Sequence, residues 1–153
     1  MASPPFIRRY VGSHVVTALH VSAPDDVVVT GRTSIGTGGR GESRPQAAVL
    51  QFRSACAMPV PAADVLLVVD VLARSSTVSD RHYRTRRYAD AGIPLYWVLD
   101  PFGERITLTE HVLAGDGVYR QEPVLTTRAD LVRPWRLTLD LGGWTAFREG
   151  LRA

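Results

Sequence analysis

The chain has 153 residues, 45% of them apolar and 22% charged, a composition typical of one soluble domain with a buried core. No stretch approaches the ~20 apolar residues of a membrane-spanning helix. The first residues also lack the regions of a signal peptide, so we expect a cytoplasmic protein that contacts no membrane. The single cysteine, Cys56, excludes an internal disulfide, and a net charge of +3 is too small to indicate nucleic-acid binding by itself.

The first third of the chain predicts a helix and a strand joined by polar turns. Residues 1–12 are expected to form a flexible start. The apolar spacing of residues 13–21 predicts a short helix, with Ser13 as its N-cap. After a turn, residues 27–29 predict a strand, and the glycine-rich residues 33–43 predict a flexible hairpin connection.

The middle of the chain predicts the centre of a sheet. Residues 46–52 form a short apolar strand, and residues 55–63, which include two prolines, form a loop. Residues 64–72 are almost wholly apolar, the pattern of a central strand covered on both faces. Residues 79–91 predict a helix that ends before Gly92.

The last third continues the sheet. Residues 93–99 predict the next strand, so a helix connects two strands of one sheet. Further strands are expected over residues 105–112, 118–120 and 136–140, and a terminal helix over residues 144–151. This order predicts an α/β (α+β) fold in which helices flank a mixed β-sheet.

Residues 36–41 match the spacing G-x-G-x-x-G of a dinucleotide-binding loop. Such a loop needs a helix directly after it, so that backbone amides meet phosphate. A strand is predicted to follow here, so we favour a hairpin without a phosphate site. The four histidines have no metal-binding spacing, and Cys56 has no neighbouring histidine that would make it a nucleophile.

Asp70 is the sharpest single feature, because it interrupts the apolar central strand. A buried carboxylate is unfavourable unless it is paired, hydrogen-bonded or bound to a metal. Two interpretations stay open: a structural role, in which Asp70 pairs with a buried arginine or belongs to a satisfied hydrogen-bond network, or a position in an active-site cleft.

The helix predicted over residues 79–91 is rich in arginine. Arg81, Arg84, Arg86 and Arg87 project in several directions, so they form no single stripe. They fit either a solvated helix face or a set of phosphate contacts for nucleic acid. Arg84 also has the spacing for an ordinary ion pair with Asp80, one helical turn earlier.

The order of the motifs resembles a known family. Residues 60–72 read VPAADVLLVVDVL and residues 88–101 read YADAGIPLYWVLDP, with a Ser-Ser and an Asp-Arg pair between them. This order is similar to the Uma-two family of proposed restriction endonucleases, whose members read like LVVEVLSPS and then YARAGVPEYWVVDP. The resemblance covers residues 44–140 and is densest over residues 64–101.

The resemblance implies one restriction-endonuclease-like domain over residues 1–153, of the PD-(D/E)xK superfamily, in agreement with the order of predicted strands. It also implies metal-dependent hydrolysis of DNA phosphodiester bonds. In that chemistry two carboxylates hold Mg²⁺ or Mn²⁺, the metal activates a water molecule, and a lysine assists.

Carried over residue by residue, the resemblance implies a degenerate site. Asp70 stands where the family has glutamate and is the candidate metal ligand. Gln46, after Pro45, replaces an aspartate and so removes an anionic ligand. Arg84 stands at the lysine position, with Tyr83 at the preceding acid, and all 18 Lys+Arg residues of this chain are arginine. Because arginine stays protonated, it cannot act as a base.

Compared with the family, the chain is expected to be shortened at its N-terminus, with an abbreviated first helix. A missing edge of the sheet would expose unpaired strand groups, which favours a homodimer. A substitute metal carboxylate would have to come from Asp25, Asp26, Glu42 or Asp80.

Three functions stay open at this point. The first is a nuclease that uses Mg²⁺ or Mn²⁺, with weak or no cleavage. The second is a non-catalytic module that binds nucleic acid or a protein, with Arg81, Arg84, Arg86 and Arg87 as phosphate contacts. The third is a metal-independent enzyme that uses Asp70, Arg84 and either Gln46 or Tyr83 on a small molecule.

Overall fold

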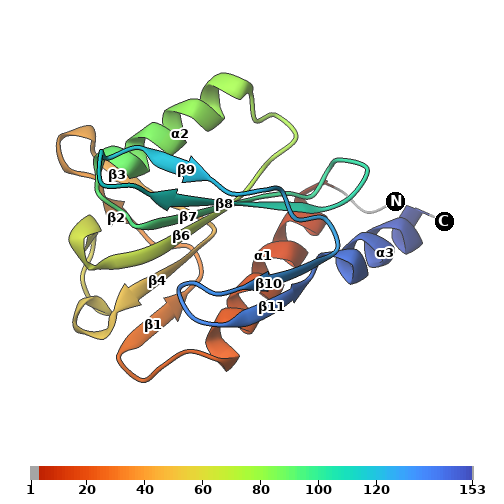
Figure 1. Ribbon diagram of the computed structural model, residues 1–153, viewed down its shortest axis with the longest axis horizontal. Helices are drawn as coiled ribbons and strands as arrows, with labels where there is room; N and C mark the ends of the chain where they lie inside the picture. Colours follow the sequence, from red (N-terminus) through yellow and green to blue (C-terminus); the bar gives the residue numbers. More distant parts are fainter. Residues whose placement is uncertain (1–3, 153) are drawn as a thin grey trace.

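The structure is a computed structural model that describes residues 4–152, and it confirms the predicted mixed fold of strands and helices (Figure 1). The helices are α1 (Pro4–Val21), α2 (Val78–Asp90) and α3 (Leu141–Arg152). The main sheet has the order β1-β4-β6-β7-β8-β9. Its strands are β1 (Val27–Thr30), β4 (Ala47–Gln51), β6 (Val65–Val71), β7 (Leu95–Asp100), β8 (Thr107–Leu113) and β9 (Tyr119–Gln121).

Two small sheets accompany the main one. The first has the order β3-β2-β5, and the second pairs β10 with β11. Their strands are β2 (Ile35–Gly36), β3 (Glu42–Ser43), β5 (Val60–Pro61), β10 (Arg128–Leu131) and β11 (Leu137–Asp140). Short 3-10 turns lie at Gly38–Arg40, Phe52–Ser54 and Ala62–Asp64.

The predicted strand–helix–strand unit forms the centre of the sheet. β6 and β7 are parallel, and α2 connects them, whereas the other neighbours in the main sheet are antiparallel. Parallel neighbours need a crossover of this kind, because the chain has to return to the same end of the sheet. The carboxyl end of β6 therefore lies beside the start of the connection that leads to α2.

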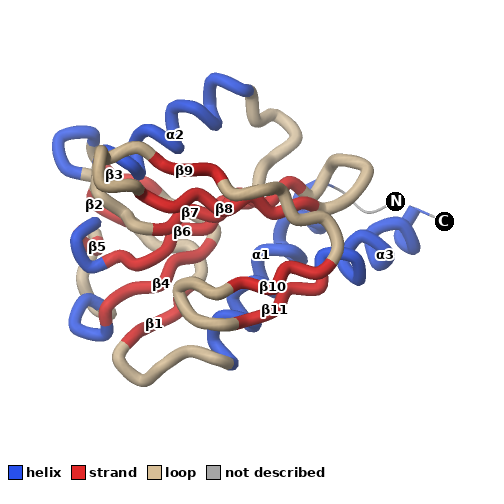
Figure 2. The backbone as a smooth tube through the Cα atoms, in the orientation of Figure 1, coloured by secondary structure: helices blue, strands red, loops and turns tan. Residues whose placement is uncertain are grey.

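The two faces of the main sheet are covered by different elements (Figures 1 and 2). On one face, α1, α3 and the β10–β11 pair bury a core that includes Val49, Leu67 and Trp97 of the sheet. On the other face, α2 and the small β3-β2-β5 sheet bury a second core, which includes Val68 and Tyr96. This burial on both faces explains why β6 is almost wholly apolar.

The start of the chain corrects the sequence prediction. Residues 4–12, expected to belong to a flexible start, are part of α1, and residues 1–3 lie outside the described residues. Ser13 is therefore an interior position of this helix and not its N-cap, and the helix is not abbreviated. The reason is an apolar stripe at a spacing of four residues, Ile7, Val11, Val15 and Leu19, whose side chains are all buried in the core.

Residues 33–43 do form a hairpin, but an ordered one. β2 and β3 pair antiparallel, and β2 also pairs in parallel with β5, in a segment that was predicted to be loop only. Gly38 and Gly41 have positive φ angles of 71° and 83°, which residues with a side chain rarely adopt. The glycines therefore serve the turn of this hairpin, and no helix follows the G-x-G-x-x-G pattern.

Two differences remain near the C-terminus. β10 was missed, because its four residues alternate between exposed and buried side chains over too short a length to be recognised. α3 begins at Leu141, directly after β11, three residues before the predicted start at Trp144. Within residues 4–152, no helix combines the length and the apolar character that crossing a membrane requires.

Candidate functional site

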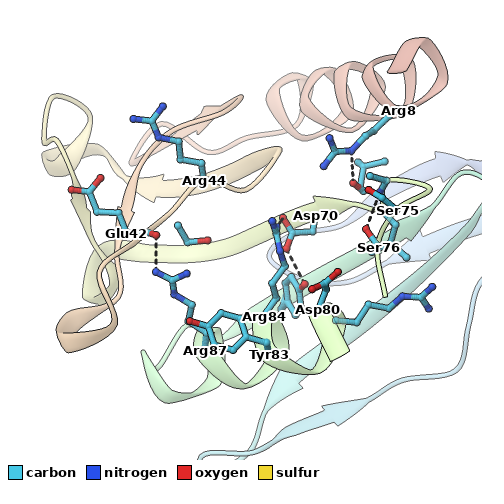
Figure 3. Close-up of a pocket in the computed structure, with 16 residues that line it drawn as sticks. Arg8, Glu42, Arg44, Asp70, Ser75, Ser76, Asp80, Tyr83, Arg84 and Arg87 are labelled. Atoms are coloured by element: carbon cyan, nitrogen blue, oxygen red, sulfur yellow. Dashed lines mark hydrogen bonds and ion pairs between the residues drawn. The ribbon is translucent and has the colours of Figure 1, made fainter. Parts of the chain in front are cut away.

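A pocket of about 520 Å³ opens at the carboxyl end of β6, between α1, α2 and the β2–β3 hairpin (Figure 3). We call it the Asp70 pocket. Its lining includes five arginines and three carboxylates. These charged residues are Arg8, Arg44, Arg81, Arg84, Arg87, Glu42, Asp70 and Asp80.

Asp70 forms the buried base of this pocket, with only 3% of its surface exposed. Its Oδ1 accepts a hydrogen bond from Arg84 Nη1 at 3.0 Å, and its Oδ2 accepts one from the Tyr96 hydroxyl at 2.9 Å. Both carboxylate oxygens are therefore engaged. The unfavourable burial of the charge is offset by one ion pair and one neutral hydrogen bond.

The pair of Asp70 and Arg84 determines the local electrostatics. The carboxylate of Asp70 raises the pKa of Arg84 above its usual value. Burial, and then the charge of Asp70, raises the pKa of Tyr96 well above its usual value, so its hydroxyl stays protonated and donates. Tyr88 behaves similarly: burial raises its pKa, and its hydroxyl bonds to the Ser43 hydroxyl at 2.6 Å.

Arg8 reaches the pocket from α1, on the opposite side of Asp70 from α2 (Figure 3). Its Nε donates to the backbone carbonyl of Val71 at 2.8 Å. Burial, and then repulsion by Arg32, lowers the pKa of Arg8. Arg8 forms no ion pair with a carboxylate among residues 4–152, so its positive charge adds to the potential of the pocket.

α2 is positioned by a capping box at its start. The Thr77 hydroxyl accepts a hydrogen bond from the Asp80 amide, and the Asp80 carboxylate accepts one from the Thr77 amide, each at 3.0 Å. One oxygen of the Asp80 carboxylate is thereby engaged by a backbone amide at the start of α2. Arg84 pairs with Asp70 and not with Asp80, in contrast to the ion pair one turn apart that the sequence suggested.

The four arginines predicted as nucleic-acid contacts fall into separate groups. Arg84 and Arg87 line the Asp70 pocket, and Arg86 lines a second cavity between α2 and strands β8 and β9. Arg81 lines both cavities. Arg87 also holds the hairpin, because it donates to the Thr37 hydroxyl at 3.0 Å and to the Glu42 carbonyl at 2.6 Å. The structure therefore does not bring these arginines together as one surface.

Gln46 lies near Asp70 in the sheet but outside the pocket lining. β4 and β6 pair Ala47 with Val69, so the antiparallel register places Gln46 across from Asp70 at the end of β4. Gln46 is half-buried and makes no side-chain hydrogen bond within residues 4–152. Gln46 is therefore a cross-strand neighbour of Asp70, but no side-chain hydrogen bond connects the two residues.

The carboxylates of the pocket do not fit a divalent metal ion. Magnesium needs several free hard oxygen ligands. Asp70 is occupied by Arg84 and Tyr96, Asp80 caps α2, and Glu42 accepts a short hydrogen bond from Ser34. Within the described part of the chain, no three histidine, cysteine or acidic side chains gather as a metal site. Asp25 and Asp26 do not line the pocket either.

Sequence reasoning missed several residues of this site. Arg8 falls within the predicted flexible start, and Arg44 lies between the predicted hairpin and the next strand, where the sequence predicts no role for it. Tyr96 is predicted only as a residue of an apolar strand. The sequence did contain a signal for Tyr96. A buried tyrosine hydroxyl usually needs a hydrogen-bond partner, and the buried carboxylate of Asp70 needs one as well. No local signal pointed to Arg8, because its approach depends on how α1 packs against the sheet.

Comparisons with known proteins agree with this fold. The family model Uma2, described as "Putative restriction endonuclease", matches residues 1–146. A crystal structure described as a "putative nuclease belonging to DUF820" from Anabaena variabilis is similar, with a TM-score of 0.60 and 11% sequence identity. The match covers 96% of this chain and 82% of that one. No curated protein matches the chain.

At 11% identity the structural likeness concerns the fold alone, whereas the family match extends over nearly the whole sequence. It includes the central strand that carries Asp70 and the helix that carries Arg84. The chain therefore belongs to the Uma2 family of restriction-endonuclease-like proteins.

Proposed function

We propose that this protein binds nucleic acid through the cationic Asp70 pocket and has lost the metal-dependent cleavage associated with its family. The observation that carries this proposal is the ion pair of 3.0 Å between Arg84 and Asp70. The guanidinium lies against the deeply buried carboxylate of the pocket, which is the metal ligand that the family resemblance implies. A permanent positive charge can attract a phosphate there, but it cannot activate a water molecule as a metal does.

The charge balance of the pocket supports phosphate as the ligand. Five arginines face three carboxylates, and Asp70 is already neutralised by Arg84. Arg8, Arg44 and Arg81 have no carboxylate partner within residues 4–152. Figure 3 shows Arg8 and Arg84 on opposite sides of Asp70, and Arg44 at the hairpin side. Phosphate binding of this kind releases counterions and weakens steeply as salt rises.

A second candidate is a metal-independent enzyme that acts on a small molecule. The volume of about 520 Å³ favours it, because this value lies within the range of small-ligand pockets, roughly 300–1,000 Å³. Of the groups considered for such chemistry, Asp70, Arg84 and Tyr83 line the pocket, whereas Gln46 does not. Turnover that is unaffected by Asp70→Asn and by Arg84→Ala would exclude this candidate.

Supercoiled plasmid tests both halves of the main proposal. The purified protein and its Asp70→Asn variant are incubated with plasmid in Mg²⁺, Mn²⁺ or EDTA. We expect no nicking above that of the variant in any condition, and a gel shift in EDTA that disappears as salt rises. Nicking that requires metal and is absent from the variant would contradict the loss of cleavage, since Asp70 would then hold an ion.

A matched pair of variants locates the binding. Arg44→Ala removes one charge from the lining of the Asp70 pocket and not of the second cavity, and Arg120→Ala removes one from exposed β9, outside both cavities. We expect Arg44→Ala to weaken binding and to lower the slope of log K against log salt by about 1, as for one lost phosphate contact. Equal effects of the two variants would mean that the pocket is not the binding site.

A further inference from the structure

An aromatic side chain stands at the edge of the Asp70 pocket. Tyr83 lies on α2 beside Arg84 and lines the pocket, although 54% of its surface is exposed. The guanidinium carbon of Arg87 lies 6.0 Å from the centre of its ring (Figure 3). One exposed aromatic residue on a helix needs no special explanation. Tyr83 differs from such a residue, because it borders a cationic pocket and has a guanidinium near its ring.

The fold does not need the Tyr83 ring. The buried residues of α2 are Tyr88 and Ala89, and of the two Tyr88 belongs to a core cluster, whereas Tyr83 is exposed and belongs to none. Its hydroxyl makes no hydrogen bond with another residue of the described range 4–152. The exposed ring of Tyr83 is therefore available to a ligand. Arg87 lies beside this ring, so a ligand that stacks on Tyr83 also comes close to a guanidinium.

Arginines and an exposed aromatic ring together match one ligand chemistry. Proteins that hold unpaired nucleotides use cationic side chains for the backbone phosphates and aromatic rings on which the bases stack. A guanidinium that lies over the face of an aromatic ring can strengthen such stacking by a cation–π interaction. In a duplex the bases are stacked on one another, so a duplex offers the pocket its phosphates but no free base.

The size of the pocket favours the same ligand. A volume of about 520 Å³ is of small-ligand size, which suits a single flexible nucleotide better than the rigid width of a double helix. The β2–β3 hairpin, fixed by Arg87, and α1, fixed by Arg8, border the pocket on two sides. An unpaired strand can bend into such a space, whereas a straight duplex can touch only its rim.

We propose that the Asp70 pocket accepts an unpaired nucleotide, with the phosphate among its arginines and the base against Tyr83. This inference rests on the proposed function, since it specifies the nucleic acid that the pocket binds. It makes Tyr83 a residue that distinguishes single strands from duplexes.

The test is fluorescence anisotropy in EDTA with a labelled short single strand of mixed sequence, and with the same sequence as a blunt duplex. We expect the native protein to prefer the single strand. Tyr83→Ala should weaken single-strand binding about tenfold, the effect of one lost base stack, and leave duplex binding nearly unchanged. Tyr83→Phe should keep the preference, because stacking needs the ring and not the hydroxyl.

Two controls separate base stacking from changes in folding. Val78→Ala alters another exposed side chain of α2, one outside the pocket lining, and should change neither affinity. A single strand in which the bases are replaced by abasic sites keeps its phosphates. It should bind the native protein as weakly as the normal strand binds Tyr83→Ala, and this comparison requires no variant.

The possible failures are distinguishable. If Tyr83→Ala and the abasic strand leave affinity unchanged while Arg44→Ala weakens binding, the role of Tyr83 is overturned and the proposed phosphate pocket stands. Equal affinity of the native protein for both nucleic acids would also overturn the inference. If neither nucleic acid binds at low salt, the proposed function fails and this inference fails with it.

Discussion

Asp70 was recognisable in the sequence as an anomaly, but its partner was not. A carboxylate within an apolar strand predicts either a pair or a functional site, and nothing in the strand itself separates the two. The structure pairs it with Arg84, fourteen positions further along the chain, and with Tyr96 on the neighbouring parallel strand. The structural interpretation and the functional one thus concern the same contact, because the pair stabilises Asp70 and also lies in the lining of the pocket.

We predict that Arg84→Ala destabilises the fold by about 1–3 kcal/mol, because Asp70 would remain buried with Tyr96 as its only partner. The value is well below that of a fully buried pair, since the Arg84 side chain is 45% exposed. Urea titration measures the change, and Arg120→Ala, which is exposed, should stay within about 0.5 kcal/mol of the native protein.

A double-variant cycle and a pH series check this explanation. Asp70→Asn should recover part of the loss when it is combined with Arg84→Ala, because the buried charge is removed. The pair with Asp70 raises the pKa of Arg84, so the stability that the charged guanidinium contributes is complete below the ordinary pKa of arginine and is lost only at a more alkaline pH. The destabilisation should therefore not vary with pH between about 6 and 9. A loss within error of the Arg120→Ala control would show that the pair is unimportant for stability.

At the scale of elements, sequence patterns succeeded where an element is long or has a capping signal. The periodicity and end signals of α2 placed it within one residue at each end, and the long apolar run located β6 in the same way. The two-residue strands β2, β3 and β5 and the four-residue β10 were not recognised as strands. Such strands exist only because a partner pairs with them, so their own sequence holds too little signal.

We predict that Thr77→Ala destabilises the protein by about 1 kcal/mol, because it removes the side chain that caps the first turn of α2. Ser79→Ala, also exposed in that turn, is the matched control and should have a smaller effect. Thermal or urea unfolding of both variants gives the comparison. Equal stabilities of the two variants would show that the capping box contributes little.

At the scale of the whole molecule, stability should depend on pH through a histidine in the sheet. His111 of β8 packs between Tyr96 and Tyr119, with ring centres 5.3 Å and 6.0 Å away, and its Nδ1 donates to the Tyr96 carbonyl. Burial lowers its pKa from the ordinary value of 6.5. The imidazole of His111 therefore binds a proton more readily in the unfolded chain than in the folded one. The stability contributed by neutral, buried His111 is present above pH 6.5 and is lost as the pH falls below that value.

We therefore predict that the free energy of unfolding declines between about pH 7 and pH 5, and declines less in His111→Gln. Urea titrations at several pH values measure both curves. Hydrogen bonds lower the pKa of Asp64 and of Asp80, and these groups lose their contribution only at more acidic pH. Parallel curves for the two proteins would exclude His111 as the cause.

The sequence by itself determined the mixed fold, the central strand with its buried Asp70, the arginine-rich helix and the family resemblance. These features depend on local periodicity, on caps and on the order of motifs, all of which can be read along the chain. The tertiary structure alone decided that Arg84 pairs with Asp70, that Arg8 enters from α1, and that Gln46 and Arg86 stay outside the pocket. Those outcomes depend on strand register and helix packing between distant residues, which no local pattern contains.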